Sequence, residues 1–146
     1  MMKQTMKTLG LLIIGFTLAK FANAQCDTVA NVCAQHLTGK FISDGQEYRA
    51  LLIDNETAEF TSTFYGNSTY RVCACSGLTE GNLNIKIYDS EHHELFDNGT
   101  FQNASHWDFK FNSTVNCTIE AKLFPSNSAT SAGSGCAVVL IGFKTQ

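Results

Sequence analysis

The amino-acid sequence predicts an all-β fold: an antiparallel, jelly-roll-like β-sandwich of about eight strands with one short N-terminal helix. Segments in which apolar and polar residues alternate recur at roughly ten-residue spacing through most of the chain. Turn-forming Ser, Thr, Asn and Gly separate these segments, and the chain holds one Pro. Eleven Phe, set mostly at alternating positions, supply the volume of a hydrophobic core.

The first 24 residues predict an export signal rather than part of the fold. Lys3 and Lys7 precede an apolar stretch, Leu9–Ala19, which is too short to span a bilayer. Ala22–Ala24 has the small-x-small pattern of a cleavage site, so we expect a mature chain that begins at Gln25. No later stretch predicts a transmembrane segment. We therefore expect a protein that is secreted, periplasmic or held at the cell surface.

The mature chain is predicted to be one acidic domain. Cleavage leaves 122 residues and removes three Lys, which takes the formal net charge from −3 to −6. An acidic domain without a basic stripe argues against nucleic acid and anionic membrane surfaces as partners. We expect a helix and linker over residues 25–45 and the β-sandwich over residues 46–146.

The helix is expected over Cys26–Thr38, the one stretch of the mature chain with helical spacing. Asp27 or Thr28 can cap its first turn, and Gly39 can end it. Steps of three and four residues place four side chains on one apolar face: Val29, Val32, Cys33 and Leu37. A linker over residues 39–46 follows, with a turn at residues 43–45.

Three strands and a hairpin make up the middle of the chain. The strands are Glu47–Ile53, Thr57–Phe64 and Thr69–Cys75, and the last of them has Cys73 and Cys75 on one face. The hairpin spans Leu83–Phe96, where a polar turn at residues 89–93 joins a longer strand to a short partner. In its first strand Leu83, Ile85 and Ile87 face the core, and Asn84, Lys86 and Tyr88 face solvent.

Three further strands follow the hairpin. His106–Asn112 places Trp107, Phe109 and Phe111 on one face, which predicts that all three belong to the core. Val115–Leu123 has the cleanest alternation in the chain. A Ser/Gly/Ala-rich loop over residues 124–135 leads to Cys136–Phe143, which is apolar on both faces. That pattern predicts a central strand, or one covered by the helix.

All six cysteines follow the expected cleavage site: Cys26, Cys33, Cys73, Cys75, Cys117 and Cys136. An even number in an exported chain predicts a disulfide framework, for which 15 connectivities exist. The paired C-x-x-C spacing of a zinc site is absent.

The disulfide partners are predicted from strand geometry. In a continuous helix Cys26 and Cys33 would lie about 10 Å apart, too far for a bond. Either Cys26 lies in a frayed first turn and folds back, or both pair elsewhere; we expect the first, a Cys26–Cys33 bond. Because Cys73 and Cys75 share one face, each can reach one remaining cysteine, so we expect Cys73–Cys117 and Cys75–Cys136.

Five segments together form a recognisable pattern: TYRVCACSG, GNLNIKIYD, HWDFKFN, CTIEAKL and GCAVVLIGF. The pattern resembles the small jelly-roll sandwiches of the pre-peptidase C-terminal type in bacterial secreted proteins and, more loosely, CUB-like domains. The resemblance implies an accessory, binding or secretion-associated module rather than a catalyst. Gly81-Asn82 replaces the acidic residues that often open the equivalent strand, which argues against a calcium site of the family type.

The candidate ligand-binding residues are Tyr88, Lys86 and Asn84, on the solvent face of the hairpin. An aromatic ring is unexpected there in a purely structural protein, and a Tyr ring can stack on a sugar. Clustered carboxylates could instead hold Ca²⁺ as a minor alternative: Asp89, Glu91, Glu94, Asp97 and Asp108. Otherwise we expect no metal and no cofactor, since His92 and His93 are adjacent and would point to opposite faces of a strand.

Six N-x-S/T sequons occur, at Asn55, Asn67, Asn98, Asn103, Asn112 and Asn116. They predict a glycosylated surface in a eukaryotic secretory pathway, or they reflect Asn in turns before strands that begin with Thr.

We predict a secreted, disulfide-stabilised, non-enzymatic binding or envelope-accessory module that binds a glycan or another extracellular protein. The alternatives are a purely structural or protective surface protein and, third, a small secreted hydrolase. The sequence holds no G-x-S-x-G motif, and the cysteines are expected to be oxidised, so nothing indicates a nucleophile.

Overall fold

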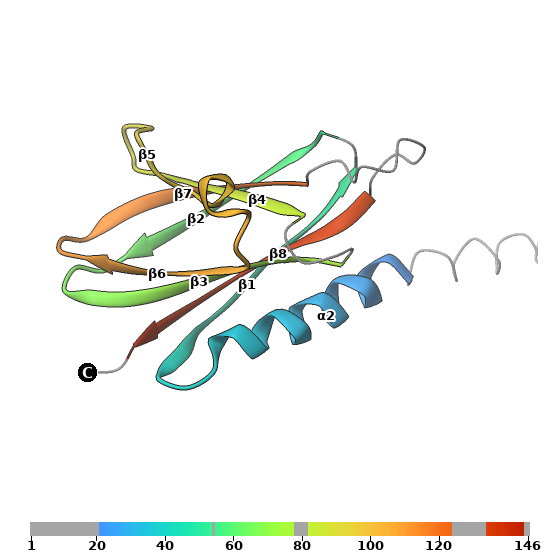
Figure 1. The fold of residues 1–146 in the computed structure, drawn as a ribbon, viewed down its shortest axis with the longest axis horizontal. Helices are drawn as coiled ribbons and strands as arrows, with labels where there is room; N and C mark the ends of the chain where they lie inside the picture. Colours follow the sequence, from blue (N-terminus) through green and yellow to red (C-terminus); the bar gives the residue numbers. More distant parts are fainter. Residues whose placement is uncertain (1–20, 54, 78–81, 124–133, 145–146) are drawn as a thin grey trace, which may run out of the picture.

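The computed structural model describes residues 21–53, 55–77, 82–123 and 134–144. These residues form eight strands in two four-stranded antiparallel sheets, with one α-helix packed against the outside of one sheet (Figure 1). The predicted all-β sandwich is therefore confirmed. Most of the expected signal and most of the expected 124–135 loop lie outside the described residues.

The helix α2 spans Phe21–Ala34 and continues into a 3₁₀ turn, η1, at Gln35–Leu37. A second 3₁₀ turn, η2, spans Asn98–Phe101. The eight strands have the following bounds: β1 Phe41–Ile53, β2 Thr57–Phe64, β3 Ser68–Ser76, β4 Leu83–Tyr88, β5 Glu94–Asp97, β6 His106–Phe111, β7 Val115–Leu123 and β8 Ser134–Lys144.

The strand order identifies a jelly roll. One sheet, here called sheet A, has the order β1-β8-β3-β6, and the other, sheet B, has the order β2-β7-β4-β5. The pairs β1–β8, β2–β7, β3–β6 and β4–β5 are all antiparallel and nested, as in one long ribbon folded over on itself. That nesting produces the two Greek keys of a jelly roll.

Strand β1 begins earlier than expected, at Phe41 rather than Glu47. The turn expected at residues 43–45 is present as a bulge within the strand: the register moves from Ser43 opposite Gly142 to Glu47 opposite Leu140. Gly45 has a φ of +84° there, which favours glycine. The hydrophobic pattern was interrupted by the bulge, so the first part of the strand resembled a linker.

The main core lies between the sheets and follows the predicted alternation. On β7 the side chains of Cys117, Ile119, Ala121 and Leu123 are buried, and on β4 those of Leu83, Ile85 and Ile87. Phe64 of β2 is fully buried, stacked on Phe111 at 4.6 Å and edge-on to Tyr70 at 5.0 Å. Burial of side chains this large contributes roughly 1.5–3 kcal/mol each.

A second core lies between α2 and the outer face of sheet A. Cys26, Val29, Ala30 and Cys33 line the buried face of the helix, and Val138 and Leu140 of β8 lie beneath them. Strand β8 is thus both central and covered by the helix, which explains why it is apolar on both faces. Val32 is 53% exposed, so its expected place on the buried face was wrong. The helix starts before Asp27, whose carboxylate pairs with Arg49 instead of capping the first turn.

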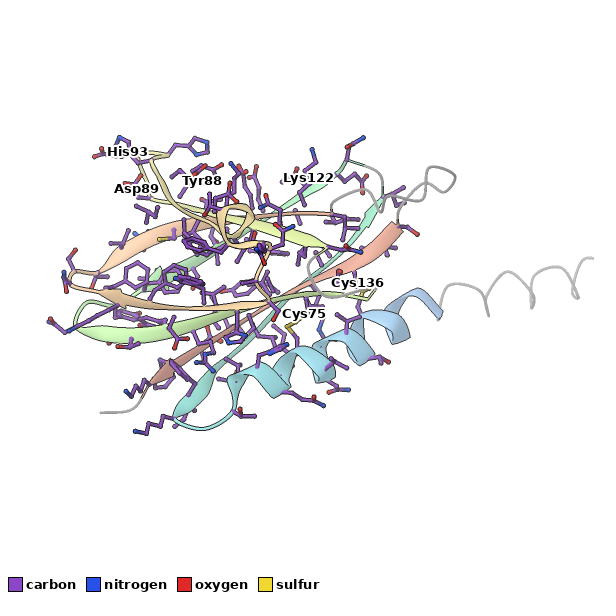
Figure 2. All side chains as sticks on the ribbon, in the orientation of Figure 1. Cys75, Tyr88, Asp89, His93, Lys122 and Cys136 are labelled. Atoms are coloured by element: carbon purple, nitrogen blue, oxygen red, sulfur yellow. A yellow bond between two sulfur atoms is a disulfide. The ribbon has the colours of Figure 1, made fainter. Side chains whose placement is uncertain are left out.

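Two disulfides join the helix to sheet A, and their pairing differs from the one predicted. Cys26 is bonded to Cys136 of β8, and Cys33 to Cys75 of β3. Cys75 and Cys136 lie on the face of the sheet beneath the helix (Figure 2). Cys73 and Cys117 are buried free thiols. All three predicted bonds, Cys26–Cys33, Cys73–Cys117 and Cys75–Cys136, were therefore wrong.

The layers of the fold explain the difference. Cys73 faces the helix, whereas Cys117 faces the core between the sheets, so sheet A itself separates the two thiols. Cys26 and Cys33 lie two helical turns apart on one face, and each therefore meets a different strand. Both disulfides link the helix to sheet A, and neither of the two links one sheet to the other.

Candidate functional site

The residues predicted to bind a ligand lie together on the outer face of sheet B, on strand β4. Tyr88 is half-buried, and its ring stacks on that of His92 at 4.5 Å. The Nζ of Lys86 lies 3.0 Å from Glu94 and 3.2 Å from Asp97, and these partners raise the pKa of the ammonium group. Tyr88, Asp89 and His93 all lie toward one edge of the molecule, around the β4–β5 hairpin (Figure 2).

Asn84, the third predicted residue, serves the fold. Its Nδ2 donates to Asp97 at 2.8 Å and to the buried Asn98 at 2.9 Å. Asn98 in turn accepts a hydrogen bond from the backbone N–H of Ile85. Asn84 and Lys86 are thus engaged by neighbouring side chains. Tyr88 has the His92 ring on one side, and desolvation, followed by the nearby Glu120, raises the pKa of its phenol.

The acidic residues considered for Ca²⁺ have structural partners. Asp89 accepts hydrogen bonds from the backbone N–H groups of His93 and Glu91, and the His93 N–H is the main reason why the pKa of Asp89 lies below its usual value. Asp108 of β6 pairs with Arg71 of β3. In the part of the chain that the structure describes, no group of three or more His, Cys, Asp or Glu side chains is arranged to hold a metal.

A cluster of aromatic side chains, here called the aromatic edge, lies where β5 of sheet B approaches β6 of sheet A: Phe96, Phe101, Trp107, Phe109 and Phe111. The rings of Phe101 and Trp107 are 4.3 Å apart, and those of Phe96 and Phe109 are 4.8 Å apart. Trp107 is 36% exposed and Phe101 is 45% exposed. Large aromatic rings are therefore stacked at the surface rather than dispersed.

The aromatic edge forms where two edge strands meet. Strands β5 and β6 end sheets B and A, and the chain leaves β5 directly into η2. Phe96 of β5 and Phe101 of η2 therefore both lie beside Trp107 of β6, at ring distances of 5.6 and 4.3 Å. Trp107 is nevertheless 36% exposed, so its expected place in the core was wrong.

An apolar cleft of about 380 Å³ adjoins the aromatic edge. Its apolar lining includes Phe96, Phe109 and Phe111, together with Leu95, which is 48% exposed. Asp89 and Lys110 are the charged residues of its lining. The apolar cleft therefore lies beside the aromatic edge, and Asp89 and Lys110 add one charge of each sign to its lining.

A larger hollow of about 890 Å³ lies around the opposite edges of the two sheets, those formed by β1 and β2. Its lining is rich in hydroxyl groups and includes Tyr48, Tyr65, Tyr70, Ser62, Thr118 and Asn116. We call it the hydroxyl-lined hollow. Its lining residues come from strands that are distant in the sequence, so no single segment predicted it.

Comparison with known proteins gives a relationship of structure but not of sequence. No family model and no curated protein matches the sequence. A crystal structure of PliG from Aeromonas hydrophila, a periplasmic inhibitor of g-type lysozyme, resembles this chain with a TM-score of 0.51 and 11% identity. The match covers 70% of this chain and 91% of that one.

The match shows that the two proteins share a fold. The resemblance to pre-peptidase C-terminal and CUB-like domains stays a prediction, because no family model matches. Among the described residues, no helix is long and apolar enough to cross a membrane.

Proposed function

We propose that this chain is an exported, non-enzymatic module that binds a protein, and that the partner docks on the aromatic edge. The observation that carries the proposal is the pair of exposed rings, Phe101 and Trp107, which pack on each other and on the buried Phe96 beside an apolar cleft. Trp and other aromatic residues that present large rigid surfaces dominate the energetics of protein interfaces.

The charges around the cluster favour a basic partner. Five carboxylates belong to β5, to the turn before it or to β6: Asp89, Glu91, Glu94, Asp97 and Asp108. Lys86 and Arg71 pair with three of them, and Lys110 is the cation among the residues that line the cleft. The chain as a whole has a formal net charge of −3. Such a surface attracts a positively charged protein and repels an acidic one.

The fold shared with PliG suggests the class of partner to test first, a lysozyme. PliG is a periplasmic inhibitor of g-type lysozyme. The two disulfides support export, since such bonds persist in oxidising compartments. The glycan interpretation of the Tyr88 face has less support, because Lys86 and Asn84 are already engaged.

The experiment measures binding and inhibition by the oxidised chain. The chain is titrated against g-type lysozyme, and against lysozymes of other types, by calorimetry and by clearing of a bacterial suspension. We expect saturable binding with loss of lytic activity. Trp107→Ala should weaken binding at least about 30-fold, the effect of a residue worth about 2 kcal/mol.

Val32→Ala is the matched control, because Val32 is exposed on the helix and lies away from the aromatic edge. It should bind with unchanged affinity. If none of the lysozymes forms a complex with the chain at about 10 µM, the lysozyme assignment is overturned, because binding with a Kd in the micromolar range or tighter is detected at that concentration. Equal binding by Trp107→Ala and the parent would overturn the aromatic edge as the docking surface.

A further inference from the structure

We infer that the hydroxyl-lined hollow is a second binding site, whose ligand is a neutral oligosaccharide. The aromatic edge lies where β5 and β6 end the two sheets, and the hollow lies around β1 and β2, which end them on the other side. The two sites open at different edges of the sandwich, and their linings come close at the β4–β5 turn, where Asp89 lines the cleft and Ser90 lines the hollow. The hollow's volume of about 890 Å³ is within the range of ligand sites.

The charge of the lining points to a neutral ligand. Asp44, in the β1 bulge, is the one acidic residue among those that line the hollow, and Lys, Arg and His are missing from this lining. Burial raises the pKa of Asp44 above its usual value. Phosphate or sulfate groups would find no cation here, and a cationic ligand would find a single carboxylate, so uncharged polar groups fit best.

The polar side chains of the hollow retain hydrogen-bonding capacity. The Tyr70 hydroxyl oxygen accepts from the backbone N–H of Tyr65 at 3.0 Å, which leaves its own proton free to donate. The Asn116 Oδ1 accepts from Thr63 at 2.7 Å, which leaves the amide N–H groups as donors. Within the described contacts neither of these donors has an acceptor. Sugar hydroxyls both donate and accept, so they can use donors and acceptors of this kind together.

Aromatic surface accompanies these polar groups. Tyr65, which directly follows β2, is 63% exposed, and Tyr48 of β1 also lines the hollow, where its hydroxyl donates to the Thr61 carbonyl at 3.2 Å. The apolar faces of sugar rings pack against rings of this type, while the hydroxyl groups around their edge form hydrogen bonds. A mixture of Tyr rings, hydroxyl groups and an amide is thus complementary to an oligosaccharide.

The chain contains its own reporter for this site. Cys117, a buried free thiol, is part of the lining of the hollow. Cys73, the other free thiol, lies under the helix in the second core. A ligand in the hollow should slow the alkylation of Cys117 and leave that of Cys73 unchanged, which gives an internal control within one molecule.

The experiment uses oxidised, unglycosylated chain and four probes: tetrasaccharides of glucose, of mannose and of N-acetylglucosamine, and an anionic tetragalacturonate. Binding is measured by calorimetry, and alkylation of the two thiols is followed by mass spectrometry. We expect at least one neutral probe to bind saturably and to protect Cys117. Tyr65→Ala and Asn116→Ala should each weaken binding about tenfold or more, a loss of about 1.4 kcal/mol.

The controls separate this site from the aromatic edge. Trp107→Ala should bind the sugar with unchanged affinity, and Tyr65→Ala should bind the protein partner with unchanged affinity. The inference is overturned if no neutral probe binds at about 10 mM, a concentration that detects even weak sites. It is also overturned if only the anionic probe binds, or if binding neither protects Cys117 nor depends on Tyr65 and Asn116.

Discussion

Cys33 of the helix is bonded to Cys75 of β3, whereas Cys73, two residues earlier on the same face of that strand, keeps a free thiol. The period of a strand places both cysteines under the helix, so the choice between them depends on where the helix lies along β3. With Cys26 bonded to Cys136 of β8, the position of the helix is fixed at two points, and Cys33 lies opposite Cys75.

The first prediction concerns the reactivity of the thiols. Burial raises the pKa of Cys73 to about 12 and that of Cys117 to about 11, so neither is a thiolate at neutral pH. We expect both thiols of the native chain to be alkylated at pH 8 far more slowly than those of the denatured chain. Two thiols should react in denaturant without reductant, and six after reduction.

Mass spectrometry of the alkylated chain checks this result. Peptide mapping should place the first two labels on Cys73 and Cys117. Labels on any other pair of cysteines in the unreduced, denatured chain would contradict the disulfide pairing described above.

The second prediction concerns the stability that each disulfide provides. The Cys26–Cys136 bond links residues 110 apart, and the Cys33–Cys75 bond links residues 42 apart. In the chain-entropy model these loops correspond to about 5 and about 4 kcal/mol. Replacing each pair by Ser should lower the free energy of unfolding by up to those amounts, with the larger loss for Cys26–Cys136.

Urea denaturation measures both losses. Cys73→Ala is the matched control, because it removes a buried sulfur from the same interface and keeps both bonds; it should cost about 1 kcal/mol. A loss for Cys73→Ala as large as that for either double variant would show that packing, rather than the covalent links, stabilises this interface.

Local patterns predicted most of the fold. The alternation of apolar and polar residues located the strands, and the two apolar faces of Cys136–Phe143 predicted a central or covered strand. The number and spacing of the strands predicted a sandwich of jelly-roll type. The disulfide partners could not be predicted in this way. A period of two assigns each cysteine to a face, but it does not say which face the helix covers and which faces the other sheet.

The contacts that form the candidate sites join different strands, so local sequence patterns could not predict them. The outer-face position of Tyr88, Lys86 and Asn84 was predicted, but their partners come from β5, η2 and the hairpin turn. The alternation placed Trp107 on the inner face of β6, but its exposure depends on how β5 and η2 pack beside it. The hollow is formed by strands at both ends of the chain, so only the folded structure brings its residues together.

The third prediction compares two neighbouring aromatic residues. Phe64 is fully buried between Phe111 and Tyr70, whereas Tyr65 is 63% exposed. Phe64→Ala should lower the free energy of unfolding by about 4 kcal/mol, because it leaves a cavity in a packed core. Tyr65→Ala should change it by about 0.5 kcal/mol or less, as is usual for surface positions.

Chemical denaturation of the two variants checks this contrast. Because the residues are adjacent in sequence, the difference measures burial alone and not a local effect on β2. Comparable losses for both variants would contradict the position of Phe64 in the core.

The fourth prediction concerns acid sensitivity. The Nε and Nη2 of Arg71 donate to the two carboxylate oxygens of Asp108 at 2.6 and 2.9 Å. These hydrogen bonds hold the pKa of Asp108 below its usual 3.8 in the folded chain. The unfolded chain therefore binds the proton more tightly. The stabilisation is complete above pH 3.8 and is lost as the pH falls from there through the folded pKa.

Asp108→Asn should therefore destabilise the protein at pH 7 and approach the parent at low pH. Because Asp108 is 44% exposed, the effect at pH 7 should be about 1 kcal/mol or less. Unfolding free energies of both proteins at several pH values between 7 and 2 measure it. A difference that stays constant over this range would show that the ion pair is not its source.

The fifth prediction concerns Asn98, the one buried polar side chain of the described core. Its Oδ1 accepts from the backbone N–H of Ile85 at 2.8 Å, and its Nδ2 donates to the carbonyls of Leu83 and Ala104. Asn98→Ala should cost about 3 kcal/mol, because it leaves buried backbone groups without partners. Asn112→Ala, at an exposed sequon, is the control and should cost about 0.5 kcal/mol or less.

The same contacts bear on glycosylation, because Asn98 opens an N-x-T sequon. A glycan on Nδ2 would remove a donor from the buried network and could not be accommodated at a side chain that is 1% exposed. We therefore expect the folded chain, when secreted from a eukaryotic host, to carry no glycan at Asn98, whereas the exposed Asn112 is free to accept one. Glycopeptide mass spectrometry of the folded fraction measures the occupancy of both sites. Substantial occupancy at Asn98 in that fraction would show that the amide network is dispensable, and the stability loss expected for Asn98→Ala would then be absent as well.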